Sequence, residues 1–151
     1  MQKGNGMKEE NKIYSWSSVD HTTDPGSWIV ITEPDWETFV IDMPKKALTR
    51  KVINYFCDET KNGWCGRELP RLFKDAKLLD IFIHARTFIC TDYALADQLF
   101  DLKQTVGKLQ KCDDLTASEA DEWLEYLQNA DKVGQFFCAV TGFLVRGCKP
   151  L

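Results

Sequence analysis

Two acidic side chains and a tryptophan directly follow a short apolar run near the start of the sequence. Residues 28–32 are Trp-Ile-Val-Ile-Thr, and Glu33, Asp35 and Trp36 come next. Ligands of open α/β sheets bind beyond the carboxyl ends of the strands, so these three side chains are candidates for contacting a substrate. The alternative is structural: Asp35 caps a turn, and Trp36 packs against a helix.

Arg67 is the second candidate site residue, and it follows a segment with two glycines, Gly63 and Gly66. A guanidinium here can pair with an anionic substrate or clamp a carboxylate, because its N–H donors match both oxygens of such a group. The alternative is a salt bridge that fixes the segment, for instance to Glu68 or Asp35. Both interpretations stay open.

The cysteines and histidines do not indicate a metal or nucleophilic site. No two of the six cysteines form a C-x-x-C pair, so we predict no zinc centre. Several cysteines lie in or beside apolar segments, which predicts buried free thiols in a reducing compartment. His84 lies on the wetter face of an expected strand, where a structural role is the commoner one.

Length and charge restrict the class of protein. The 151 residues suit one domain. A net charge of -4 and a pI of about 5.2 argue against a protein that binds duplex nucleic acid. Lys45, Lys46, Arg50 and Lys51 come nearest to a basic run, and we interpret them as the solvated face of a helix. No apolar stretch could span a bilayer or act as a signal peptide, which predicts a cytoplasmic protein without a membrane span.

The chain divides into a polar lead and one folded domain. Residues 1–23 are expected to be poorly ordered, with a possible short strand at residues 12–19. The domain covers residues 24–151. Its first strand, residues 28–32, is apolar throughout, which predicts cover on both faces, and Pro34 is expected to end it.

Helices and a second strand follow. Asp42 and Pro44 mark the expected start of a helix that stops at Asn62-Gly63. A shorter helix covers residues 69–76, with Pro70 in its first turn. From Leu79 onward apolar and polar residues alternate, which predicts a strand with one wetter face.

The last third of the chain predicts two helices and a central strand. Asp92 can cap a helix with a regular apolar pattern over residues 95–109. Thr116 and Glu119 form a capping box before another helix. Residues 136–149 are apolar on both faces, so this last strand should be central. The order of strands and helices predicts an α/β fold.

Four pieces of the sequence carry a family resemblance through their order and spacing. They are Asp24-Pro25-Gly26-Ser27, Glu33-Pro34-Asp35-Trp36, Asn62-Gly63-Trp64-Cys65-Gly66-Arg67-Glu68-Leu69-Pro70 and Phe136-Phe137-Cys138-Ala139-Val140-Thr141-Gly142-Phe143. With them, residues 24–151 resemble class I S-adenosylmethionine-dependent methyltransferases of type 11, which include ubiquinone/menaquinone-biosynthesis-like enzymes. Where the family typically has Pro-Gly-Gly, this chain has Pro25-Gly26-Ser27.

The resemblance implies a partial Rossmann-like sheet. Residues 28–32 would be the fifth strand of the family's sheet, the Leu79 segment the sixth, and the last strand the seventh, antiparallel and inserted between the other two. Helices would flank this sheet. The domain would then be the carboxyl-terminal, substrate-side half of a methyltransferase, with Glu33, Asp35, Trp36 and Arg67 near a small-molecule methyl acceptor.

The resemblance also implies a missing cofactor half. The family holds S-adenosylmethionine with a glycine-rich turn after the first strand and an acidic residue after the second. Here Gly4-Asn5-Gly6 follows no strand, so we expect that this chain alone does not bind the cofactor. No catalytic residue and no metal ligand is assigned.

Three hypotheses about function remain. The chain is a methyltransferase fragment that needs a missing amino-terminal half, a stand-alone binding or dimerisation module, or a small enzyme of another mechanism. In the first two, the fifth strand is left as an apolar edge, and such edges pair with other chains. We therefore expect either a homodimer through that edge or its coverage by residues 12–19.

Overall fold

The computed structural model describes residues 24–151, so the predicted poorly ordered lead and its short strand at residues 12–19 lie outside the described residues. The elements are β1 (Trp28–Ile41), α2 (Lys46–Glu59), α3 (Cys65–Asp75), β2 (Leu79–Cys90), α4 (Tyr93–Phe100), α5 (Leu102–Lys111), α6 (Ala117–Lys132) and β3 (Cys138–Cys148). Residues 24–151 thus form an α/β domain with one three-stranded sheet and five helices. In this range no helix has the length and apolar character needed to pass through a bilayer.

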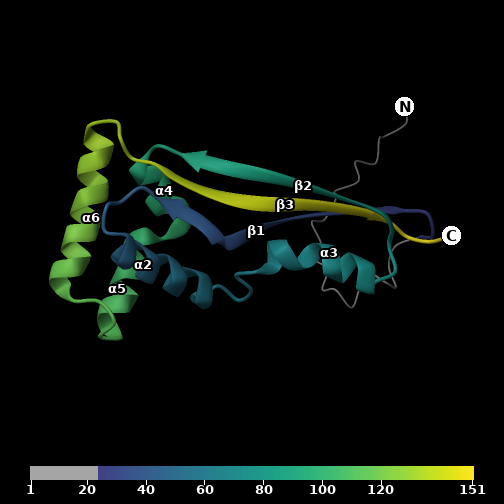
Figure 1. Cartoon of the computed structure of the whole chain (residues 1–151), viewed down its shortest axis with the longest axis horizontal. Helices are drawn as coiled ribbons and strands as arrows, with labels where there is room; N and C mark the ends of the chain where they lie inside the picture. Colours follow the sequence, from purple (N-terminus) through teal and green to yellow (C-terminus); the bar gives the residue numbers. More distant parts are fainter. Residues whose placement is uncertain (1–23) are drawn as a thin grey trace, which may run out of the picture.

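The last strand, β3, lies in the middle of the sheet (Figure 1). The strand order is β1-β3-β2, and β3 runs antiparallel to both neighbours. The prediction that the final strand is central is therefore confirmed. The first three residues of β3, Cys138, Ala139 and Val140, are all buried, which agrees with the apolar residues on both of its faces.

Two separate apolar cores hold the helices on opposite faces of the sheet. Helices α2, α4, α5 and α6 gather at one end of the strands, and α3 lies along the other end (Figure 1). The larger core includes Trp123, Phe100 and Val140, and the smaller includes Phe73 and Val145. Val140 and Val145 are an odd number of residues apart on β3, and side chains alternate along a strand, so the two cores lie on opposite faces.

The first strand continues well past its predicted end. Pro34 does not end β1 but lies opposite Gly142, and the pairing with β3 reaches Ile41. An edge strand tolerates proline, because its outer N–H groups need no partner strand. The prediction of cover on both faces is also wrong: Ile29 is buried, whereas Trp28 and Val30 are 53% and 57% exposed.

A bulge interrupts β1 between Asp35 and Val40. Asp35 lies opposite Thr141 and Val40 lies opposite Ala139, so residues 36–39 all fall against one residue of β3. Four residues of β1 thus oppose one residue of β3, so β1 holds three extra residues, an odd number. Side chains alternate between the two faces of a strand, so the residues after the bulge point to the faces opposite to those expected without it. This inversion lets Ile29 pack into the smaller core and Ile41 into the larger one.

The two helices after β1 differ from the prediction in their first turns. Helix α2 begins at Lys46 after Lys45, which makes no side-chain cap hydrogen bond, so Asp42 does not cap it. Helix α3 begins at Cys65, which places Pro70 in the second turn rather than the first.

The single helix predicted over residues 95–109 is wrong. The chain forms α4 and α5, which are separated at Asp101, a residue in the left-handed conformation with φ of 49°. Aspartate tolerates this conformation better than most residues, because its short side chain can hydrogen-bond locally. The break takes Leu95 and Leu99 out of the expected apolar stripe and leaves them 44% and 51% exposed.

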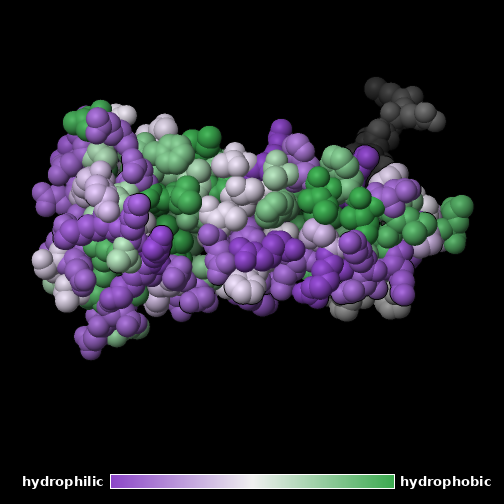
Figure 2. Space-filling model, viewed as in Figure 1, coloured by the Kyte–Doolittle hydropathy of each residue, from purple (hydrophilic) through white to green (hydrophobic). Residues whose placement is uncertain are grey.

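The second strand, β2, is exposed on both faces, although one wetter face was predicted. Phe82 and Ile83 are neighbours that point to opposite faces, yet they are 49% and 50% exposed. Figure 2 shows apolar residues gathered on the surface over the strands, at the end where α3 lies.

The predicted caps of α4 and α6 are confirmed. The Asp92 side chain accepts a hydrogen bond of 2.8 Å from the backbone N–H of Leu95. Thr116 Oγ1 accepts from the Glu119 N–H, and Glu119 Oε2 accepts from the Thr116 N–H. Behind this capping box, α6 buries the predicted face with Ala120, Trp123 and Leu127.

Candidate functional site

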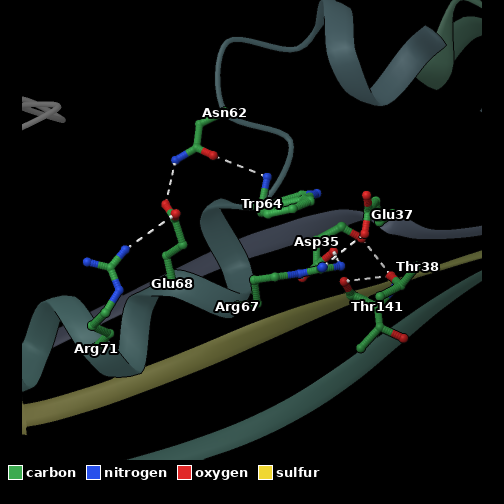
Figure 3. Close-up of polar contacts among 9 residues, drawn as sticks. All are labelled: Asp35, Glu37, Thr38, Asn62, Trp64, Arg67, Glu68, Arg71 and Thr141. Carbon is green, nitrogen blue, oxygen red and sulfur yellow. Dashed lines mark hydrogen bonds and ion pairs between the residues drawn. The ribbon is translucent and has the colours of Figure 1, made fainter. Parts of the chain in front are cut away.

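The candidate site is centred on an ion pair between Asp35 of β1 and Arg67 of α3 (Figure 3). The pair is bidentate: Arg67 Nε donates to Asp35 Oδ2 at 2.5 Å, and Arg67 Nη2 donates to Asp35 Oδ1 at 2.6 Å. Arg67 Nη1 also donates to Glu37 Oε2 at 2.9 Å. One guanidinium therefore joins two carboxylates of β1 to the first turn of α3.

Close backbone packing brings Arg67 to this position. The backbone N–H of Trp36 donates to the Gly63 carbonyl at 2.9 Å, which ties the segment before α3 to β1. A Cβ atom at Gly66 would lie 2.9 Å from the backbone oxygen of Glu33, so only glycine fits there without displacement. The first turn of α3 thus lies directly against β1, within reach of Asp35.

Burial makes the ion pair necessary. The Asp35 side chain is 1% exposed and that of Arg67 is 39% exposed. A buried carboxylate without a cation would be costly, because removal from water penalises its charged form. The hydrogen bond to Asp35 raises the pKa of Arg67 above its ordinary value. The guanidinium also lies 4.9 Å from the centre of the exposed Trp64 ring.

Two threonines hold the bulged backbone beside the ion pair. Thr38 Oγ1 donates to the Asp35 carbonyl at 2.6 Å and accepts from the Thr141 N–H at 2.8 Å. The hydroxyls of Thr141 and Thr87 are 3.0 Å apart. These bonds fix the chain on both sides of Asp35, so the carboxylate is held in one orientation.

The structure brings together two of the four predicted site residues. Asp35 and Arg67 form a salt bridge, which is the structural alternative considered for Arg67. The Trp36 ring packs edge-on against Phe56 of α2 and Phe100 of α4, at centroid distances of 5.1 Å and 6.0 Å, as its structural alternative had it. The side chain of Glu33 is half-buried.

Glu68, the other acidic partner considered for Arg67, lies elsewhere in the same region. It accepts hydrogen bonds from Asn62 and Arg71 (Figure 3). The sequence did not point to Glu37 and Thr38, because the strand was expected to end at Pro34. The alternation of Asp35, Glu37 and Phe39 was the available signal for a continuing strand.

The six cysteines are all free and lie within residues 24–151. Cys57, Cys90 and Cys138 are buried, as predicted for part of the set, whereas Cys112 is exposed. Burial raises the pKa of Cys138 to about 12, so its thiol stays protonated at neutral pH. Among residues 24–151, no three His, Cys, Asp or Glu side chains are grouped as metal ligands would be.

Comparison with known proteins gives one informative similarity. No protein-family model matches the chain. Over 122 residues, or 80% of this chain, the sequence is 32% identical to an uncharacterized 37.1 kDa protein in transposon TN4556 of Streptomyces fradiae. The match covers 34% of that relative. The chain is therefore similar to a transposon-encoded protein of which it spans about a third of the length.

Proposed function

We propose that residues 24–151 form the substrate-side part of a class I S-adenosylmethionine-dependent methyltransferase domain. The observation that carries this proposal is the strand order β1-β3-β2, with the last strand antiparallel between the other two. The family resemblance implies this arrangement for its fifth, seventh and sixth strands. The spatial order of these strands differs from their order along the chain. Agreement in this spatial order therefore supports the proposal more than agreement in composition would.

In this proposal the cofactor is held by another part of the protein or by a second chain. Residues 24–151 contain no G-x-G turn, the feature that lets a backbone approach the cofactor closely. Methyl transfer depends mainly on the alignment of the acceptor, the methyl group and the leaving sulfur. A substrate-side part contributes to this alignment by holding a small-molecule methyl acceptor in place.

The Asp35–Arg67 pair would serve this alignment as a positioning device. It fixes the segment before α3 against β1 at the residue where the bulge begins. The Arg67 side chain keeps 39% of its surface exposed, so part of this side chain could contact the acceptor. Glu33, beside it on β1, would form part of the same surface.

Calorimetric titration with S-adenosylmethionine tests the proposal. This chain alone is expected to give no binding heat. The full-length Streptomyces fradiae relative is expected to bind, and so is a chimera in which residues 24–151 replace its matched segment. Absence of binding by the full-length relative would contradict the proposal, and binding by this chain alone would show that no second half is needed.

A second candidate function is a non-catalytic binding or dimerisation module. The observation that favours it is the outer edge of β1, which pairs with no strand within residues 24–151 and on which Trp28, Val30 and Val40 are each more than half exposed. We expect a homodimer through this edge, detectable by light scattering during size-exclusion chromatography. Val30→Lys should shift the protein towards monomer, and Lys77→Ala, on the exposed turn before β2, serves as the control. A chain that is monomeric at every concentration would rule out this candidate.

A further inference from the structure

We propose that a groove between α2 and the bulged end of β1 binds an organic carboxylate with an apolar body. The groove has a volume of about 440 Å³, which falls in the range of small-molecule sites, roughly 300–1,000 Å³. It is lined by Glu37, Phe39, Val40, Ile41, Met43, Lys46, Thr49, Arg50, Ile53 and Asn54. This inference concerns binding alone and does not depend on methyl transfer.

The floor of the groove is apolar and comes from both elements. Phe39 and Ile41 of β1 belong to the larger core, as does Ile53 of α2. Val40, between Phe39 and Ile41, is 51% exposed. An apolar ligand body on this floor would gain about 25 cal/mol for each Å² of apolar surface removed from water. The floor therefore selects for a ligand with an aliphatic or aromatic part.

The rim of the groove carries two cations that form no ion pair within residues 24–151. Of the four basic residues near the start of α2, Lys45 forms an ion pair with Glu122, and Lys51 donates to the carbonyl of Asp114. Lys46 and Arg50 line the groove, and neither contacts an acidic side chain within residues 24–151. They are four residues apart on the helix, so they lie on the same side of it.

The acidic residue of the lining does not cancel these charges. Glu37 is the only carboxylate among the described lining residues, and one of its oxygens is bound by Arg67 Nη1 at 2.9 Å. The groove thus offers an excess of positive charge beside an apolar floor. A carboxylate matches the planar donor fork of Arg50 and the point charge of Lys46. Asn54 adds an amide to the same helix face, one turn beyond Arg50.

Octanoate is a suitable probe, because it combines a carboxylate with an apolar chain. Calorimetric titration of the full chain should give a dissociation constant below about 1 mM. Octanol, which has the same chain without the charge, should bind at least tenfold more weakly. Arg50→Gln and Lys46→Gln should each weaken octanoate binding roughly tenfold, the effect of losing one charge-assisted hydrogen bond.

Lys51→Gln is the matched control, because Lys51 lies on the same helix but does not line the groove. All three residues are exposed, so the variants should keep the wild-type circular dichroism spectrum. The proposal is overturned if octanoate does not bind, or if Lys51→Gln weakens binding as much as Arg50→Gln does. Neither result bears on S-adenosylmethionine binding.

Discussion

At the scale of single residues, Asp35 is the most constrained acidic side chain of the described domain. It is 1% exposed, and the fork of Arg67 contacts both of its oxygens. A buried ion pair adds little net stability, since desolvation offsets the attraction between its charges. Loss of one partner is different, because the remaining charge stays buried without compensation. Asp35 therefore needs the positive charge of Arg67, whatever else Arg67 binds.

Arg67→Ala is expected to lower the free energy of unfolding by about 2 kcal/mol, measured by urea denaturation. Removal of one partner of a fully buried pair costs roughly 3–5 kcal/mol, and the 39% exposure of Arg67 reduces this. Arg71→Ala is the matched control on the same helix, because Arg71 forms only exposed pairs with Glu68 and Asp75. It should cost less than about 0.5 kcal/mol.

The same experiment with Arg67→Lys separates charge from geometry. Lysine keeps the positive charge but lacks the planar fork, so this variant should fall between the wild type and Arg67→Ala. Equal unfolding free energies for Arg67→Ala and Arg71→Ala would mean that water or another group compensates Asp35.

At the scale of elements, features that depend on neighbouring residues were predictable from the sequence, whereas features that depend on residues far along the chain were not. The caps Asp92 and Thr116 were predicted correctly, because each bonds to backbone within three residues. The extension of β1 was missed, because it depends on pairing with the distant strand β3, in which Pro34 lies opposite Gly142 and Ile41 opposite Cys138. The family resemblance implied the central place of β3 and the apolar pattern agreed, but neither indicated the break at Asp101.

The capping box of α6 gives a direct test of this distinction. Thr116→Ala should lower the free energy of unfolding by about 1 kcal/mol, because it removes the acceptor for the Glu119 N–H. Asp42→Ala should have little effect, since Asp42 resembles a cap in the sequence but does not cap α2. Thermal or urea unfolding of both variants measures the difference, and equal losses would contradict the assignment of the caps.

The same box predicts a dependence of stability on pH. The backbone N–H of Thr116 lowers the pKa of Glu119 below its ordinary value of 4.5. The folded protein therefore holds this proton less tightly than the unfolded chain does. The resulting stabilisation is complete above the unfolded pKa and is lost as pH falls through the folded pKa. Glu119→Gln should flatten this part of an unfolding curve measured against pH.

Two glycines predict opposite effects of one substitution. Gly66→Ala should destabilise the protein by roughly 1–3 kcal/mol, because the new methyl group would meet the backbone oxygen of Glu33 at 2.9 Å. Gly107→Ala should stabilise it by about 0.5–1 kcal/mol, because Gly107 lies inside α5 and an added Cβ would meet nothing within 4 Å beyond its chain neighbours and the backbone of its own helix. Changes in unfolding free energy, relative to the wild type, that have the same sign for both variants would contradict this account.

At the scale of the whole molecule, β3 contributes to both cores, as β1 does, and it is also the strand that pairs with both of the others. Val140 packs into the core of the helix group, and Val145 packs into the core under α3. By contrast, β2 is exposed from Leu79 to Ile89 except at half-buried Ile81. Stability within one domain varies with the amount of buried apolar contact. The two strands should therefore open at different rates.

Amide hydrogen exchange measured by mass spectrometry is expected to show this difference. Peptides from β3 should exchange slowest among the strands, and peptides from β2 should exchange faster, since little apolar contact opposes local opening. Peptides from α6, with Trp123 and Leu127 fully buried, provide an internal reference for slow exchange. Equal protection of β2 and β3 would indicate that another surface covers β2.

The bulge in β1 also restricts how this protein can diverge during evolution. Residues 36–39 invert the faces of the strand, so Ile29 and Ile41 enter cores on opposite sides of the sheet. Insertion or deletion of one residue there would turn Ile41 outward and Val40 inward. A change of two residues would preserve both orientations. Homologues are therefore expected to vary the length of this segment in steps of two, which a collection of related sequences can reveal.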